Sequence, residues 1–171
     1  MVYCAHETFS LVERLKATED LKLTEDLTMS NEKNKVFEDE FMEVQSNLLA
    51  LTLETTGKIV DKIFAYCSIE KKSMMFNVFF EVNGEIKTLN LLGLDGKNAM
   101  QLLRVGTNNL EKIKEVCKKY NKPAPSEIKM VYDMKSEKLD VNYQYGEICS
   151  AKTNMSAEEV FMKWIAEMKQ A

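Results

Sequence analysis

The chain has 171 residues, of which 45% are hydrophobic and 29% are charged, so it can bury one full-sized core and is too apolar to be disordered throughout. Its formal net charge of −4 argues against nucleic acid as a direct ligand, because duplex binding needs a basic surface that releases counterions. No apolar run approaches the ~20 residues that a membrane span needs, and residues 1–10 lack the pattern of a secretory signal. We therefore expect a cytoplasmic protein that does not bind membranes.

The cysteines and the single histidine do not predict a metal site. Cys4, Cys67, Cys117 and Cys149 form no C-x-x-C pair, and His6 is the only histidine. Buried free thiols are the better interpretation, and we expect no metal or other cofactor.

Residues 1–35 predict an N-terminal extension that is helical or loosely ordered. Phe9, Val12 and Leu15 allow a short amphipathic helix. A near-repeat of Thr-Glu-Asp-Leu follows at 18–21 and 24–27, and each copy has the composition of a helix start. Two copies are too few for a solenoid.

The pattern is clearer after the extension, where a helix is followed by three strands. Apolar residues recur at helical spacing and predict a helix at about 33–56, with Gly57 as its stop. Alternating apolar residues then predict strands at 59–70, 74–82 and 85–91. Asn83-Gly84 predicts a tight hairpin turn, because a type I′ turn needs a positive φ at both central residues.

The remaining elements are a helix, a second hairpin and a last helix. Gly93, Gly96 and Gly106 favour a loop or a short helix over 94–105, and Thr107 is a candidate cap for a helix at 108–121. Strands at 127–134 and 138–146, with a turn at 135–137, form the hairpin. Ser156 and Glu159 have the spacing of a capping box before the helix that carries Trp164. This order predicts an α+β fold over 36–171, in which an antiparallel sheet, a meander plus a hairpin, packs against helices.

No catalytic motif is present. The chain lacks G-x-S-x-G, H-E-x-x-H and a Walker loop, and the glycines are too widely spread to cradle a phosphate. His6, the only histidine, lies in the terminal extension, and we interpret it as incidental and not as a catalytic base. We therefore expect a binding protein and not an enzyme.

Acidic residues are concentrated at the start of the first long helix. The segment from Glu19 to Glu43 has a net charge of about −6, which is more negative than the whole chain. The ordinary interpretation is a solvated helix face, with Asp39, Glu40 and Glu43 on one exposed side and the nearby phenylalanines turned inward. The functional interpretation is a docking surface for a basic protein. The candidate partner-binding residues are Glu38, Asp39, Glu40 and Glu43.

Two segments resemble a known family. The run Phe76–Ile86, which contains the Asn-Gly turn, and the late strand Leu139–Gly146, with Trp164 after it, are similar to the YezG-like immunity (antitoxin) proteins of bacteria. The resemblance extends over about residues 40–168 and implies a protein that neutralises a toxin, commonly a nuclease, by tight binding. It assigns no interface residue.

Two functions are compatible with these observations. The first is an immunity protein that binds and neutralises a cognate bacterial toxin, a basic protein of the nuclease type. The alternative is a non-catalytic cytosolic adaptor or regulatory protein-binding domain. The pattern makes no prediction of the oligomeric state.

Overall fold

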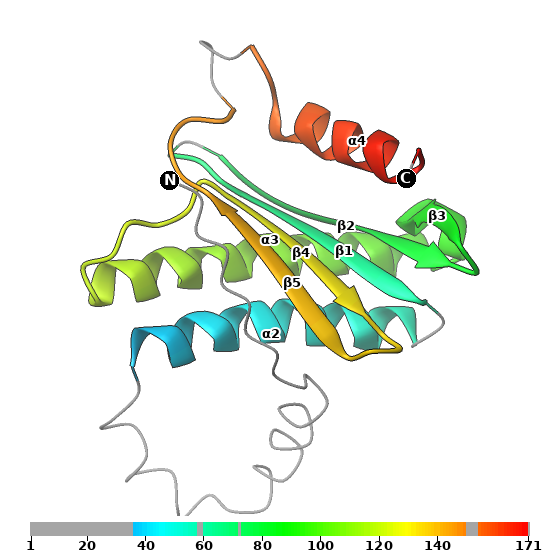
Figure 1. Cartoon of the computed structure of the whole chain (residues 1–171), viewed down its shortest axis with the longest axis horizontal. Helices are drawn as coiled ribbons and strands as arrows, with labels where there is room; N and C mark the ends of the chain where they lie inside the picture. The colour runs from blue at the N-terminus through cyan, green and yellow to red at the C-terminus, as the bar shows by residue number, and fades with distance from the viewer. Residues whose placement is uncertain (1–35, 58–59, 72, 150–153, 171) are drawn as a thin grey trace, which may run out of the picture.

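The computed structural model describes residues 36–57, 60–71, 73–149 and 154–170. Within them, five antiparallel strands form one sheet in the order β3-β2-β1-β4-β5, and three α-helices pack against it (Figure 1). The predicted α+β class with an antiparallel sheet is confirmed. The predicted extension at 1–35, with its short helix and its near-repeat, lies outside the described residues.

The strands agree closely with the predicted ones. Asn83 and Gly84 have φ values of 53° and 78°, as the predicted turn between β2 and β3 requires. The third strand is shorter than predicted, because the chain leaves the sheet after Thr88 and forms a short 3-10 helix, η3 (Leu89–Leu92). The strands are β1 (Lys62–Ile69), β2 (Met74–Val82), β3 (Glu85–Thr88), β4 (Glu127–Asp133) and β5 (Lys138–Gln144).

Two helices cover one face of the sheet. They are α2 (Phe37–Thr56) and α3 (Gly96–Lys119), and Figure 1 shows them side by side on the same side of the strands. Alternate residues of β1, such as Ile63 and Cys67, pack with fully buried Leu48 of α2 in the larger hydrophobic core. Both predicted helices therefore pack on the sheet, as expected from their apolar stripes.

The start of α3 corrects the sequence prediction. Residues 96–105, predicted as a loop or a short helix, are the first part of the continuous helix α3, so this helix begins well before the predicted 108. Gly106 lies in the middle of the helix. A glycine is needed there because Phe76 of β2 packs directly against it, and a Cβ would come within 2.1 Å of the ring. Thr107 is not a cap, since its Oγ1 accepts a hydrogen bond from the Phe76 amide at 3.1 Å. This bond satisfies the Phe76 amide, which lies in the part of β2 that β3 does not reach.

The last helix, α4 (Ala157–Met168), covers the opposite face of the sheet (Figure 1). Its predicted capping box is confirmed: Glu159 N–H donates to Ser156 Oγ at 3.1 Å, and Ser156 N–H donates to Glu159 Oε2 at 2.7 Å. Trp164 packs edge-on against Phe79 with ring centroids 4.9 Å apart, and Phe79 stacks on Phe64. A second, aromatic core thus fixes α4 to β1 and β2.

The Gly106 contact yields a stability prediction. Gly106→Ala adds a methyl group against the Phe76 ring, so we expect the free energy of unfolding to fall by about 1–3 kcal/mol. The same change inside a solvent-exposed helix would be stabilising. Gly96→Ala is the matched control, because it lies at the start of the same helix with nothing within 4 Å of the added Cβ. Urea denaturation of both variants measures their free energies of unfolding. A Gly106→Ala protein as stable as the wild type would contradict the packing described.

Candidate functional site

The four predicted partner-binding residues lie in the first two turns of α2, but they are not equivalent. Glu38, Asp39 and Glu43 are exposed, and we call these three the α2 carboxylates. Glu40 is half-buried, with only 18% of its side chain accessible, so the expectation that it shares an exposed side with Asp39 and Glu43 is wrong. Phe41 is buried and Phe37 is half-buried, as predicted for the inner side of this helix.

Glu40 is turned toward α3. Its Oε1 forms an ion pair with Lys119 in the last turn of α3 and accepts a hydrogen bond from the Tyr120 hydroxyl at 2.9 Å. The hydrogen bond to Glu40 raises the pKa of Lys119 above its ordinary value. The Tyr120 ring also packs edge-on against Phe37 of α2. Glu40 therefore ties the start of α2 to the end of α3, which shows that the two helices run antiparallel.

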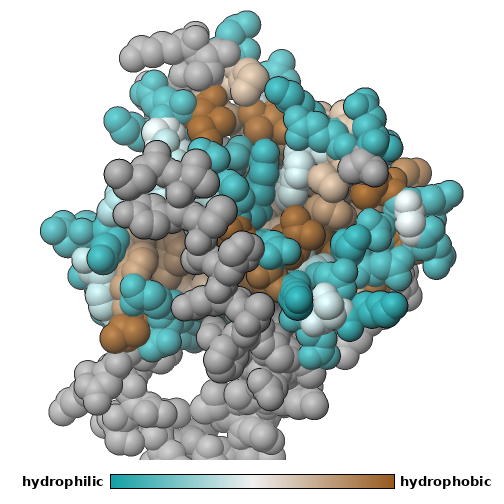
Figure 2. Space-filling view, viewed as in Figure 1, coloured by the Kyte–Doolittle hydropathy of each residue, from teal (hydrophilic) through white to brown (hydrophobic). Residues whose placement is uncertain are grey.

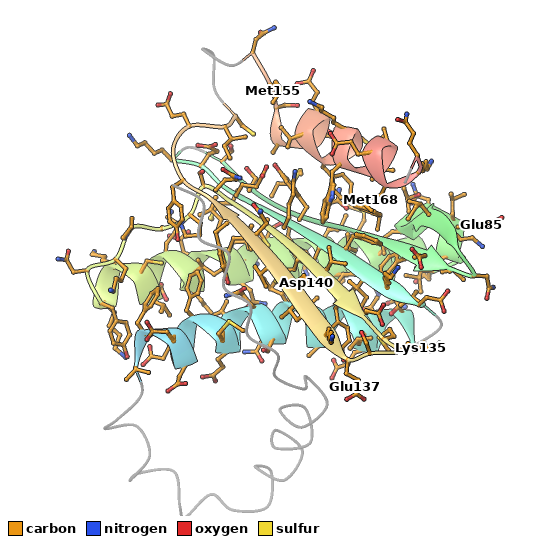
Figure 3. The ribbon with its side chains drawn as sticks, viewed as in Figure 1. Glu85, Lys135, Glu137, Asp140, Met155 and Met168 are labelled. Carbon is orange, nitrogen blue, oxygen red and sulfur yellow. The ribbon has the colours of Figure 1, made fainter. Side chains whose placement is uncertain are left out.

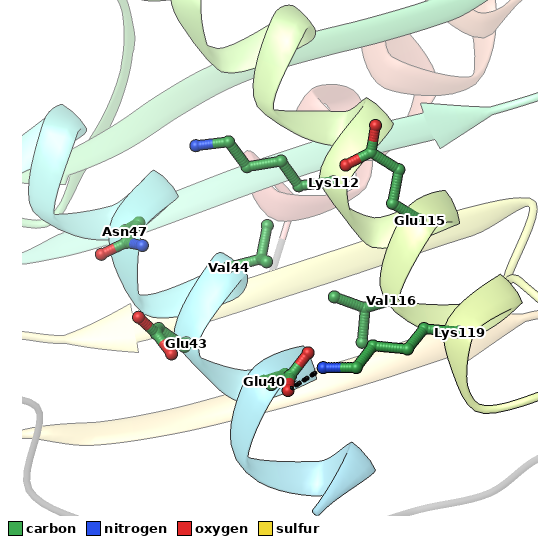
Figure 4. A pocket seen from close by; sticks show the side chains of 8 residues that line it. All are labelled: Glu40, Glu43, Val44, Asn47, Lys112, Glu115, Val116 and Lys119. Atoms are coloured by element: carbon green, nitrogen blue, oxygen red, sulfur yellow. Dashed lines mark hydrogen bonds and ion pairs between the residues drawn. The ribbon is translucent and has the colours of Figure 1, made fainter. Parts of the chain in front are cut away.

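A shallow groove separates α2 from α3 near this ion pair (Figure 4). Val44 and Val116 contribute apolar side chains, and Figure 4 shows Lys119 reaching across to Glu40. Glu43 on the α2 side and Lys112 on the α3 side give the groove charges of both signs. A groove of mixed charge is better matched to the polar surface of another protein than to a small anion. The lining residues are Glu40, Glu43, Val44, Asn47, Lys112, Glu115, Val116 and Lys119.

A second polar cluster lies under α4. Glu127 is only 4% exposed, and its Oε2 accepts a hydrogen bond from the buried Tyr66 hydroxyl at 2.9 Å. Lys129 Nζ lies 3.7 Å from Glu127 Oε1 and 5.4 Å from the centre of the Trp164 ring. Burial, helped by the nearby Glu127, raises the pKa of Tyr66 well above its ordinary value. The cluster satisfies a buried charge within the aromatic core, and this is a structural role.

The three cysteine side chains that the structure describes do not form an activated nucleophile. Cys67 and Cys117 are buried, Cys149 is half-buried, and burial raises the pKa of all three thiols. A raised pKa keeps a thiol protonated, whereas a nucleophilic cysteine needs the thiolate. Cys4 and His6 lie outside the described residues.

Neither a metal centre nor a membrane span is found in the part of the chain that the structure describes. No three residues of the types His, Cys, Asp and Glu are grouped there so that they could hold an ion. None of the helices described is both long and apolar enough to cross a membrane.

Exposed acidic residues also occur outside the α2–α3 layer. Figure 2 shows hydrophilic side chains around much of the visible face, with hydrophobic ones scattered among them. Figure 3 labels Asp140 on β5, and Lys135 and Glu137 at the turn between β4 and β5. Asp140, Glu147 and Glu167 are exposed acids outside the α2–α3 layer, and we call them the control carboxylates.

Comparison with known proteins adds no relative, since no protein-family model and no curated protein matches the chain. The functional argument therefore depends on the geometry described above.

Sequence reasoning did not identify the α3 side of the groove. Lys112, Glu115 and Lys119 were not among the predicted site residues, although Lys118 and Lys119 end the helix where cations are favoured by its dipole. That enrichment was a usable signal for a basic helix end. Nothing local, however, showed that this end would meet the acidic start of α2.

The different positions of Glu40 and Asp39 yield a prediction. Glu40→Gln removes the charge that holds Lys119, so we expect a clear loss of stability, measured as a lower urea midpoint. Asp39→Asn changes an exposed residue on the same helix turn, and its free energy of unfolding should stay within about 0.5 kcal/mol of the wild type. Equal midpoints for the two variants would show that Glu40 has no internal role.

The buried carboxylate gives a second prediction. Tyr66→Phe removes the hydroxyl that donates to Glu127 and leaves the carboxylate short of a partner, so we expect a loss of about 1–3 kcal/mol in unfolding free energy. Glu127→Gln keeps an oxygen that can accept the same bond and should cost less. Chemical denaturation followed by the fluorescence of Trp164, the single tryptophan, measures both. The reverse order of stabilities would contradict this account of the cluster.

Proposed function

We propose that this protein is an immunity protein that binds a basic toxin of the nuclease type through the start of α2 and thereby blocks it. The observation that carries the proposal is the character of α2, which has five acidic residues and no basic residue. Three of the acids, the α2 carboxylates, are exposed on a helix whose other side is buried in the core.

The rigidity of α2 supports this role. Leu48 and Leu49 are fully buried, and Glu40 ties the first turns to α3, so the α2 carboxylates project from a fixed backbone. A preorganised surface loses little conformational entropy on binding, which favours tight association. Glu40 thus holds the site in place, and in this proposal its exposed neighbours make the contact with the partner.

The charge of the surface indicates the chemistry of the partner. A nuclease presents a basic groove because its substrate is a polyanion. Carboxylates on a fixed helix are attracted to such a groove, which raises the association rate and can occlude the substrate. The resemblance of the β2–β3 and β5 segments to YezG-like immunity proteins points to the same kind of partner.

The experiment begins with the product of the neighbouring gene. The two proteins are co-expressed and co-purified, and the nuclease activity of the partner is then measured with and without this protein. A one-to-one complex that suppresses the activity supports the proposal. A complex that leaves the activity unchanged supports the adaptor instead, and failure to bind any neighbouring basic protein would contradict the immunity function.

Charge reversal locates the contact. The change Glu38→Lys, Asp39→Lys and Glu43→Lys should slow association with the toxin by about tenfold or more at low salt, because it removes electrostatic steering. It should also weaken the dependence of the association rate on salt. Stopped-flow or surface-based kinetics at two ionic strengths measure both effects.

The matched control reverses the same number of charges elsewhere. Lysine at all three control carboxylates changes the net charge equally but leaves the α2–α3 layer intact. Its association rate should stay much closer to that of the wild type. Equal effects of the two triple variants would reduce the role of α2 to that of overall charge.

A further inference from the structure

The two helices of the exposed layer carry opposite charges. α2 has five acidic residues and no basic one, whereas α3 has six basic residues and two acidic ones. The acidic residues of α2 are Glu38, Asp39, Glu40, Glu43 and Glu54, and the basic residues of α3 are Lys97, Arg104, Lys112, Lys114, Lys118 and Lys119.

The antiparallel packing arranges these charges in two parallel rows. Glu40 at the start of α2 meets Lys119 at the end of α3. At the other end, Glu54 of α2 lines a shallow cavity with Asn98 and Gln101 from the start of α3. The acidic start of α2, which carries four of the five acids, therefore lies beside the basic end of α3, which carries four of the six basic residues.

Such a layer is complementary to a second copy of itself in one orientation. Rotation by a half-turn about an axis parallel to the helices, along the groove, places α2 of one copy over α3 of the other. Position along the axis is unchanged, so the acidic start of one α2 faces the basic end of the other α3. A half-turn about an axis across the helices would stack α2 on α2, which like charges oppose. We propose that two copies of this chain associate through the α2–α3 layer about a two-fold axis parallel to these helices.

The chemistry of the surface sets the character of this association. Met100 is the one large, strongly exposed hydrophobic residue that the structure describes within α2 or α3, so little apolar area is available. The contact is therefore electrostatic, fast to form and sensitive to salt, because the Debye length falls from ~10 Å at 0.1 M salt to ~3 Å at 1 M. The association does not depend on the proposed function, although a basic partner would compete with the second copy for α2.

The first test uses the full chain alone. Sedimentation velocity over a range of protein concentrations should show a monomer–dimer equilibrium at low salt and a monomer at 1 M salt. A protein that stays monomeric at low salt at its highest soluble concentration would overturn the proposal. So would a dimer that is insensitive to salt.

The second test uses complementary charge reversals. One variant carries lysine at the three α2 carboxylates, and the other carries Lys112→Glu and Lys118→Glu on α3; Lys119 is kept because it pairs with Glu40. In the first variant both helices are net positive, and in the second the last part of α3, residues 111–119, changes from a net charge of +2 to −2 beside the acidic start of α2. Each variant alone should therefore be monomeric at low salt. A mixture of the two should form a heterodimer, because each helix then again faces its opposite.

The mixture also serves as the test of folding, since a misfolded variant could not restore association. The variant with lysine at the control carboxylates should dimerise like the wild type. If the wild type dimerises and each charge-reversed variant alone still does so, the contact lies elsewhere. The same conclusion follows if the two variants do not associate when mixed. In either case the proposed toxin binding would still stand on its own kinetics.

Discussion

The structure depends on a central strand that is buried on both faces. β1 pairs with β2 on one side and β4 on the other, and seven of its eight residues are buried. Antiparallel sheets often leave one face to water, but a strand of this kind requires a layer on each side. α2 and α3 supply one layer and α4 the other. Buried Tyr66 and Glu127 are compatible with this arrangement because they are hydrogen-bonded to each other and Lys129 pairs with the Glu127 carboxylate.

With helices on both faces of the sheet, the outer side of α2 and α3 is exposed, and charged residues determine its character. Acids at the start of α2 and lysines at the end of α3 each oppose the partial charge of their helix end, which stabilises both helices. Because the helices are antiparallel, these ends meet, and Glu40 uses the proximity for an internal ion pair. The exposed α2 carboxylates are not needed for that contact. The start of the same helix therefore contains one acid, Glu40, that serves the fold and three others that are exposed to solvent.

Local patterns predicted most of the fold. Period-two alternation and the Asn83-Gly84 turn located the strands, because the local chemistry determines both. The continuity of α3 was missed because Gly96 and Gly106 favoured a loop or a separate short helix, whereas Gly106 is explained by contact with Phe76, far away in the chain. The site was predicted only as a list of acids on one helix. The role of Glu40 comes from Lys119, 79 residues away, and no local pattern contains such a contact.

Hydrogen–deuterium exchange tests the central claim, that the protein acts through the start of α2, most directly. Exchange is measured for the protein alone and for its complex with the toxin of the neighbouring gene. The amides of α2 and of the facing end of α3 should gain the most protection, while those of β5 and α4 change little. Protection centred on α4 or on β5, with α2 unaffected, would contradict the account.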